Sequence, residues 1–457
     1  MSFEVNLAYI FIASIALYFI AKNRALNLRS RHKFIATVGY HALFVSLITF
    51  VPSVVILIFW TLLEGSFLQW MVLRSLPIEL ITIDYTSNYL FNEIINIANG
   101  VIPIDSSNTL HVIGVQRYED AAALSRGIKI IIVFGSIALL GFYGLFKIGP
   151  NFNARLSSEV IIRRVLAGLS VIAVLTTFGI LLSILFESLR FFQSVSISEF
   201  LFGTQWSPQT AIREDQVGSS GAFGAVPVFL GTFLIAIVAM MVAIPFGLMS
   251  AIYLSEYSNA NVRDFMKPLL EVLAGIPTVV YGYFAALVVG PFIREMGSIF
   301  EWELTSESAL AVGLVMGVMI IPFVSSISGD VITAVPKSLR EASYGCGATK
   351  SETILKVVIP AALPGIIAGV LLAVSRAIGE TMIVVMAAGL AANLTLNPLK
   401  PVTTVTAQIV TLLVGDQEFD STKTLAAFAL GLVLFIVTLT LNIIALHVVR
   451  KYREQYE

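Results

Sequence analysis

The chain has 457 residues, of which 57% are hydrophobic and 12% are charged, and its mean hydropathy is +0.89. A soluble domain usually has a charged fraction of about 25%, so this composition predicts a polytopic membrane protein. The formal net charge of −1 argues against a role in binding nucleic acid. The single cysteine, Cys346, excludes an internal disulfide and any metal site built from several cysteines.

Nine apolar segments are long enough to cross a hydrocarbon core that is about 30 Å thick. They cover residues 5–21, 34–62, 128–147, 165–186, 226–253, 268–293, 309–328, 364–389 and 424–448. The expected fold class is therefore an all-α polytopic membrane protein with about nine transmembrane helices.

The distribution of charge between the loops predicts how the chain is oriented. The run from Lys22 to Lys33 contains five basic residues and no acidic residue. The segment 63–128 is instead rich in acidic residues, which are Glu64, Glu79, Asp84, Glu93, Asp105, Glu119 and Asp120. Because loops rich in lysine and arginine stay in the cytoplasm, we expect the N-terminus outside the cell and the C-terminus in the cytoplasm.

The composition predicts two parts that meet near residue 150. Residues 1–150 hold three spans and an external loop, 63–127, whose high apolar content favours a folded cap over disorder. Residues 151–457 hold the other six spans, and the polar segment from Lys147 to Arg164 is the expected linker. Within the second part, residues 226–448 form a core that carries the recognisable motifs.

Two short helices joined by a sharp turn are predicted between Pro336 and Pro360. Pro336 suits the first turn of a helix, where its missing amide has no partner, and Gly347 suits the left-handed conformation that stops a helix. The sequence Thr349-Lys350-Ser351-Glu352 is typical of a capping box that starts a second helix. Pro360 cannot continue a helix, so we expect the pair of helices to end there.

This stretch reads Glu341-Ala342-Ser343, three residues, Gly347, nine residues, and then Val357-Val358-Ile359-Pro360. It resembles the EAA loop of ABC importer permeases, which reads Glu-Ala-Ala, three residues, Gly, nine residues and Ile-x-Leu-Pro. The resemblance implies that the loop docks on an ATPase subunit and couples ATP hydrolysis to transport. The residues that it assigns to this role are Arg340, Glu341, Ala342, Ser343, Gly347 and Pro360. The alternative is an ordinary amphipathic cytoplasmic loop.

Further motifs extend the resemblance over roughly two-thirds of the chain. They are Gly224 to Pro227, Ile244 to Gly247, Lys267 to Gly282 and Ser375 to Met382, and they resemble PstC-type permease subunits of bacterial phosphate-specific ABC importers. The resemblance implies a six-helix type I importer core in the bacterial cytoplasmic (inner) membrane. It also implies three kinds of partner: a second permease (PstA-type), an ATPase dimer (PstB-type) that holds ATP and Mg, and an external phosphate-binding protein (PstS-type).

Arg376 and Glu380 are the charges most informative about substrate. Counted from 364 to 389, both lie near the middle of the eighth span, where a charge costs at least about 2.5–3.5 kcal/mol and needs a partner. Their i, i+4 spacing predicts that they share one helix face and pair. The alternatives are a structural ion pair and an anion site, in which the guanidinium binds phosphate oxygens. Ser375 and Thr381 are candidate additional donors.

Several other residues have a predicted structural role or lack a chemical one. Gly275 and Pro277 inside the sixth span predict a hinge or a close helix contact, with the two roles left open. The run ending Thr349-Lys350-Ser351 lacks the P-loop glycine before lysine, and the four histidines show no metal-binding spacing. We therefore expect no catalytic residue, no metal and no cofactor on this chain. Gln205 to Pro208 predicts a turn or a contact with an external protein.

Phosphate is the substrate that the resemblance implies, and sulfate, molybdate and phosphonate remain alternatives within the same class. From other classes, an ion-coupled secondary transporter and an intramembrane enzyme were considered. A secondary transporter predicts inverted repeats, and an enzyme predicts a nucleophile with its base. The sequence displays neither pattern, and a secondary transporter would leave the EAA-like loop unexplained.

Overall fold

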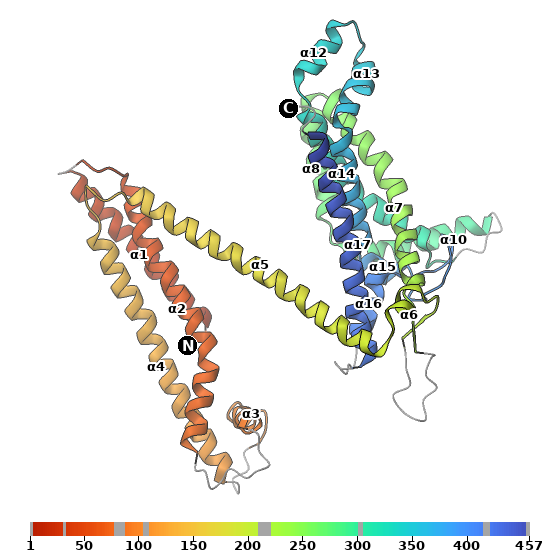
Figure 1. Cartoon of the computed structure of the whole chain (residues 1–457). Coiled ribbons are helices and arrows are strands. Elements are labelled where there is room, and N and C mark those ends of the chain that lie inside the picture. The colour runs from red at the N-terminus through yellow and green to blue at the C-terminus, as the bar shows by residue number, and fades with distance from the viewer. Residues whose placement is uncertain are drawn as a thin grey trace. The chain divides into compact units, whose positions relative to one another are not determined.

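A computed structural model describes residues 3–30, 33–76, 87–103, 109–208, 221–299, 305–414 and 421–453. The chain divides into two compact units, Met1–Thr176 and Thr177–Glu457 (Figure 1). The two units meet within one long helix, α5 (Ala154–Ser194).

The described residues are almost entirely helical. In the first unit the helices are α1 (Phe3–Arg29), α2 (Val38–Ser75), α3 (Ser87–Ala98) and α4 (Thr109–Phe146). After α5, the second unit contains α6 (Ile197–Phe202), β1 (Trp206–Ser207), β2 (Ala222–Phe223), α7 (Val226–Ile252), the π-helical turn η2 (Tyr253–Tyr257), α8 (Ala260–Gly275), α9 (Thr278–Phe284), the π turn η3 (Ala285–Val289), α10 (Gly290–Ile299), α11 (Ala309–Ala334), α12 (Lys337–Gly345), α13 (Lys350–Thr353), the π turn η4 (Ile354–Val358), α14 (Ile359–Ile378), α15 (Met382–Ala387), α16 (Val405–Leu413) and α17 (Thr422–Arg453). Nine helical runs within these residues are long and apolar enough to cross a membrane, which confirms the predicted fold class.

In the first unit, α1, α2 and α4 lie side by side (Figure 1). The predicted loop 63–127 is largely helical in its described part, because α2 continues to Ser75 and α4 already begins at Thr109. The short helix α3 packs there on a buried apolar cluster made of Val72, Leu76, Leu90, Phe91, Ile94 and Ala121. The apolar patch at 78–83 lies outside the described residues.

In the second unit, α7 and α11 form the closest helix pair. A Cβ atom added to Gly313 on α11 would lie 2.5 Å from Val238 Cγ1, and one added to Gly317 would lie 2.8 Å from the Ala239 carbonyl oxygen. The two glycines are four residues apart, which places them on one face of α11. This is the small-residue spacing that lets two membrane helices bring their backbones together.

We expect Gly317→Val to destabilise the second unit by about 1–3 kcal/mol, because the added atoms meet the backbone of α7. Gly179→Val on α5 is the matched control, since a Cβ atom there meets nothing within 4 Å. The measurement is the thermal unfolding midpoint of each variant purified in detergent. Equal midpoints for the two variants would show that α7 and α11 do not depend on this close approach.

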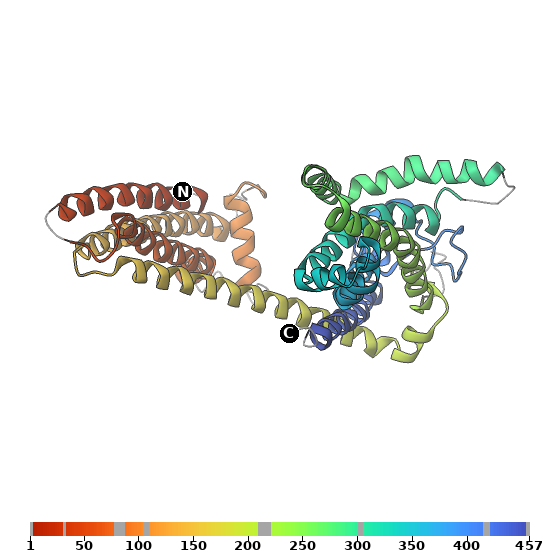
Figure 2. The same cartoon turned by 90° about the horizontal axis from the view of Figure 1, so that it is seen from above.

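The sixth predicted span, 268–293, is broken in the structure. Helix α8 ends at Gly275, and α9 begins at Thr278 after Pro277, whose ring disfavours helical geometry at the residue before it. A Cβ atom on Gly275 would meet nothing within 4 Å, so the structure favours a break at this position over a close contact. Helix α10 lies across the direction of α7, α14 and α17 (Figures 1 and 2).

The prediction that Pro360 ends the hairpin is wrong. Pro360 lies in the first turn of α14, and one helical run continues from Lys350 to Ile378. The π turn η4 directly precedes α14, whose second residue is the proline. Local widening of this kind is one way in which a membrane helix satisfies backbone groups that a proline would leave without partners. Pro336 also differs slightly from expectation, since it is the N-cap of α12 rather than a residue of its first turn.

Gln205 to Pro208 does not form a simple turn. Trp206 and Ser207 form β1, which pairs antiparallel with β2. The Trp206 ring is buried, and its Nε1 donates to Gln408 Oε1 at 2.8 Å. Because this ring is enclosed within the second unit, it is not a surface contact for an external protein.

Candidate functional site

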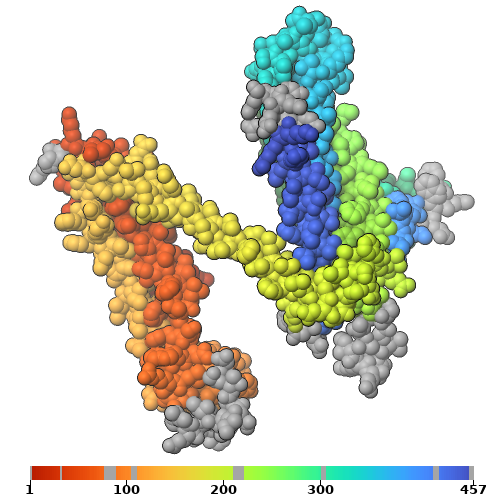
Figure 3. Space-filling view, viewed as in Figure 1, coloured from red at the N-terminus to blue at the C-terminus, as the bar shows by residue number. Residues whose placement is uncertain are grey.

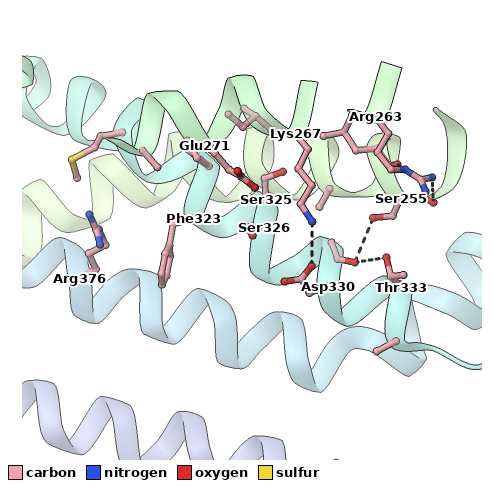
Figure 4. Close-up of a pocket in the computed structure, with 18 residues that line it drawn as sticks. Ser255, Arg263, Lys267, Glu271, Phe323, Ser325, Ser326, Asp330, Thr333 and Arg376 are labelled. Carbon is pink, nitrogen blue, oxygen red and sulfur yellow. Dashed lines mark hydrogen bonds and ion pairs between the residues drawn. The ribbon is translucent and has the colours of Figure 1, made fainter. Parts of the chain in front are cut away.

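A cavity of about 670 Å³ is lined by residues of α8, α11, the end of α7 and η2 (Figure 4). Arg376 reaches it from the last turn of α14. The polar and charged residues that line the cavity are Ser255, Arg263, Lys267, Glu271, Ser325, Ser326, Asp330, Thr333 and Arg376. Three of these side chains are basic and two are acidic, so the charges of the lining favour an anion over a cation.

Two of the basic groups in the cavity already have partners. Lys267 Nζ lies 3.7 Å from Asp330 Oδ1. Arg263 donates from Nε to the Leu254 carbonyl at 2.7 Å and from Nη2 to the Ser255 carbonyl at 3.0 Å. These bonds hold Arg263 against η2.

Arg376 has a different environment. Its guanidinium carbon lies 5.7 Å from the centre of the Phe323 ring, and its side chain is exposed in the isolated chain. Within the described residues, no hydrogen bond or ion pair to the Arg376 side chain is present. Its planar set of donors is therefore open to the cavity, and this geometry suits the oxygens of a tetrahedral anion.

The predicted pairing of Arg376 with Glu380 on one helix face is wrong. Helix α14 ends at Ile378, with Gly379 as its C-cap, so Glu380 lies beyond the last turn. Glu380 is absent from the cavity lining, and no ion pair joins it to Arg376 in the described part of the chain. The carboxylates in the cavity wall are instead those of Glu271 and Asp330.

The predicted depth of Arg376 is supported by its neighbour. Phe323 lies near the middle of α11, a candidate membrane span that covers Ala309–Ala334. The backbone from Gly379 to Thr381 is not helical, and the Thr406 Oγ1 hydroxyl donates to the Glu380 carbonyl at 2.6 Å. Non-helical backbone at membrane depth occurs where it is enclosed by protein or lines a cavity, and broken helices of this kind mark substrate sites in transporters.

The two candidate hydroxyl donors lie close to the break but not in the cavity lining. Thr381 Oγ1 donates to the Gly379 carbonyl at 3.3 Å, and Ser375 is half-buried on α14. Lys267 and Asp330 also belong to the site, although their positions in the sequence did not predict it. Both lie near the ends of apolar segments, where a solvated charge is the simpler interpretation, and only the approach of α8 to α11 brings them together.

The second candidate site is the docking hairpin, which we define as residues 337–358. It projects from the end of the second unit (Figures 1 and 3). Gly347 has φ of +86°, as predicted, and follows the end of α12. Thr349 and Glu352 form the predicted capping box, with Thr349 N donating to Glu352 Oε2 at 3.0 Å. Ser343 Oγ lies 2.9 Å from Thr353 Oγ1 and ties the two helices together.

The residues predicted to dock do not share one orientation. Glu341, Ala342 and Gly347 are exposed on the hairpin. Arg340 instead turns inward, with its side chain 15% exposed, and pairs with Glu256 at 2.7 Å. Metal binding is a separate question. The described residues contain no group of three or more His, Cys, Asp or Glu side chains that could hold a metal ion.

Comparisons with known proteins match both units. Residues 7–176 match a family described as "Phosphate ATP-binding cassette transporter", and residues 243–454 match "Binding-protein-dependent transport system inner membrane component". The probable ABC transporter permease protein YqgH of Bacillus subtilis is 34% identical over 244 residues, which are 53% of this chain and 75% of that protein. The phosphate transport system permease protein PstC of Mesorhizobium japonicum is 30% identical over 264 residues, covering 54% and 76%.

A solved structure of the MetNI methionine ABC transporter in an inward-facing conformation is similar over 50% of this chain and 94% of its own chain, with a TM-score of 0.37 and 17% identity. The match to each of the two permease relatives spans about three-quarters of that relative's length, at 30% identity or more. The chain therefore belongs to the family of binding-protein-dependent transport system inner membrane components, the membrane-embedded permeases of ABC transporters.

Proposed function

We propose that this chain is the permease subunit of an ATP-driven importer that moves inorganic phosphate across the bacterial cytoplasmic (inner) membrane. The observation that carries the proposal is the Arg376 guanidinium, which faces a cavity at membrane depth and has no carboxylate partner among the residues that the structure describes. An arginine at such a depth has a high free-energy cost of insertion into the membrane, so it usually has a functional role. The names of the PstC relatives and of the family matched by residues 7–176 support phosphate as the anion.

In this proposal, Arg376 binds phosphate through parallel N–H···O bonds. Glu380 lies just beyond the C-cap of α14, so its carboxylate tunes the local field from the helix break rather than by direct pairing. Ser375 and Thr381 are candidate donors when the backbone between them moves. Lys267 and its partner Asp330 line the same cavity and offer the anion a second positive group.

The proposed importer contains further subunits, and the first of them is suggested by the exposure of Arg376. Arg376 is exposed in the isolated chain, so a second, PstA-type permease is the partner that would cover it and complete the pathway. The docking hairpin receives a PstB-type ATPase dimer, which holds ATP and Mg and carries out the hydrolysis. A PstS-type binding protein delivers phosphate on the outer side. The chain itself binds no cofactor and is not an enzyme.

The transport cycle is a switch between two rigid-body arrangements. Closure of the ATPase dimer moves the docking hairpin, and the cavity opens outward to receive phosphate. Hydrolysis restores the inward-facing arrangement. In the membrane, the N-terminus lies outside, and the docking hairpin and the C-terminus lie in the cytoplasm. The basic run from Lys22 to Lys33 supports this orientation, because basic loops stay in the cytoplasm.

The proposal is tested by purifying the chain together with its partners and reconstituting the complex in liposomes. We expect ATP hydrolysis and uptake to rise when phosphate and its binding protein are present. A rise with sulfate, molybdate or phosphonate instead would assign the chain to another oxyanion. Uptake driven by an ion gradient without any ATPase would replace the proposal with a secondary transporter.

A further inference from the structure

Arg340 is the most completely engaged basic side chain on the docking hairpin. Its Nε and Nη2 both donate to Glu256 Oε1, at 3.2 and 2.7 Å. Nη2 also donates to the Ile332 carbonyl at 2.8 Å, and Nη1 donates to the Val335 carbonyl. The two side chains are only 15% and 10% exposed, so this pair is screened far less than a surface ion pair.

These bonds connect three separate pieces of the chain. Glu256 belongs to η2, the π turn that continues α7. Ile332 supplies a carbonyl in the last turn of α11, where it also accepts from the Val335 amide at 3.3 Å, and Val335, the C-cap residue of α11, supplies the second carbonyl. Arg340 belongs to α12, the first helix of the docking hairpin. One guanidinium therefore fastens the docking hairpin to the ends of both helices of the α7–α11 pair.

Other contacts strengthen the same connection. Lys350 Nζ lies 5.1 Å from the centre of the Tyr257 ring, which joins the second hairpin helix to η2. Leu339 packs on a buried apolar cluster that includes Ala251, Ile332 and Val358. The docking hairpin thus has an apolar contact and two charged contacts with the helix ends beneath it.

The Arg340–Glu256 ion pair lines a depression that adjoins the cavity containing Arg376. A shallower depression of about 360 Å³ is lined by Glu256 and Arg340 together with the hairpin residues Lys337, Glu341 and Tyr344. It shares Ser255, Arg263 and Thr333 with the wall of the cavity. Glu256 directly follows Ser255, and Ile332 directly precedes Thr333, so each anchor of Arg340 is adjacent to a residue of the cavity wall.

We propose that Arg340 and Glu256 form an intrasubunit clamp that transmits movement of the docking hairpin to the wall of the Arg376 cavity. Arg340 is thus a positioning residue and not a docking contact with the ATPase. When the ATPase moves the hairpin, the clamp makes η2 and the end of α11 follow as one body. This inference rests on the proposed function, because it explains how ATP hydrolysis is coupled to transport.

The test compares Glu256→Gln and Arg340→Lys with wild type in the co-purified complex reconstituted in liposomes. Glu256→Gln keeps the shape of the side chain and removes its charge, whereas Arg340→Lys keeps the charge and removes the planar fork. For both variants we expect phosphate moved per ATP hydrolysed to fall at least tenfold while the ATPase still co-purifies. The double variant is expected to be no worse than either single variant, because each breaks the same connection.

Glu159→Gln is the matched control, since Glu159 forms an exposed ion pair with Arg155 on α5. It is expected to keep the wild-type ratio of transport to hydrolysis. An unchanged ratio in Glu256→Gln would overturn the clamp. Loss of the co-purified ATPase in Arg340→Lys, with no effect of Glu256→Gln, would overturn it too and would make Arg340 a docking contact.

A second measurement does not depend on which anion is carried. Cys346, the single cysteine in the sequence, is exposed on the docking hairpin, and Asp264→Cys adds a second exposed site on α8. Spin labels on this pair report the distance between the hairpin and α8. We expect a narrow distance distribution with the clamp intact and a broad one after Glu256→Gln. An equally narrow distribution in the variant would overturn the clamp, even if the complex moved no phosphate.

Discussion

Arg376→Ala is expected to abolish phosphate uptake while the permease still assembles with its partners. Removing the guanidinium deletes the charged donor that the cavity presents to the anion, and losing such a charged hydrogen-bonding partner costs about 2–5 kcal/mol. Arg376 forms no ion pair with any residue that the structure describes, so the change breaks none among them. The measurement is uptake of radiolabelled phosphate into liposomes, with co-purification of the partners as the readout for assembly.

Two further variants sharpen this test. Arg376→Lys retains the positive charge but loses the planar fork, so we expect intermediate uptake. Arg155→Ala, which removes an exposed arginine of α5 outside the cavity, is expected to transport as wild type does. Normal uptake by Arg376→Ala would remove Arg376 from the substrate pathway, whatever the other variants show.

Gly347→Val is expected to weaken binding of the ATPase at least tenfold. Gly347 has φ of +86°. In this left-handed region, a Cβ atom raises the conformational free energy by about 1–2 kcal/mol, and a β-branched side chain raises it further. The turn between α12 and α13 must then reorganise, and the exposed surface around Glu341 and Ala342 loses its shape. The measurement is the affinity of the purified permease for its ATPase subunit.

Gly345→Ala is the matched control on the same hairpin. It lies at the end of α12, its φ is outside the left-handed region, and a Cβ atom there meets nothing within 4 Å. We expect this variant to bind the ATPase as wild type does. Equal affinities for Gly347→Val and Gly345→Ala would show that the left-handed turn does not determine the docking surface.

The sequence by itself predicted the features that depend on neighbouring residues. Nine apolar segments were long enough to span a membrane, and the structure contains nine such helical runs in its described part. Gly347 and the capping box at Thr349 were also predicted correctly, because a left-handed glycine and an N-cap act within one turn of the chain. The EAA-like spacing identified the family for the same reason, since it is a local pattern.

The end of α14 was decided by tertiary structure. Arg376 and Glu380 have the spacing of a helical pair, and the single glycine between them, Gly379, does not by itself force the helix to stop at Ile378. The backbone beyond the helix is held by a contact from α16, where Thr406 donates to the Glu380 carbonyl across 26 residues of sequence. Periodicity within a segment does not encode a contact of that kind.

The surroundings of the charged residues also depended on the fold. Arg340 and Glu256 are 84 positions apart, yet they form a partly buried pair that turns a residue predicted to dock into one that faces inward. Lys267, Asp330 and Arg376 likewise meet around one cavity from three different helices. Sequence determined which segments become helices because helix formation is local, whereas only packing between distant helices determined which charges share a site.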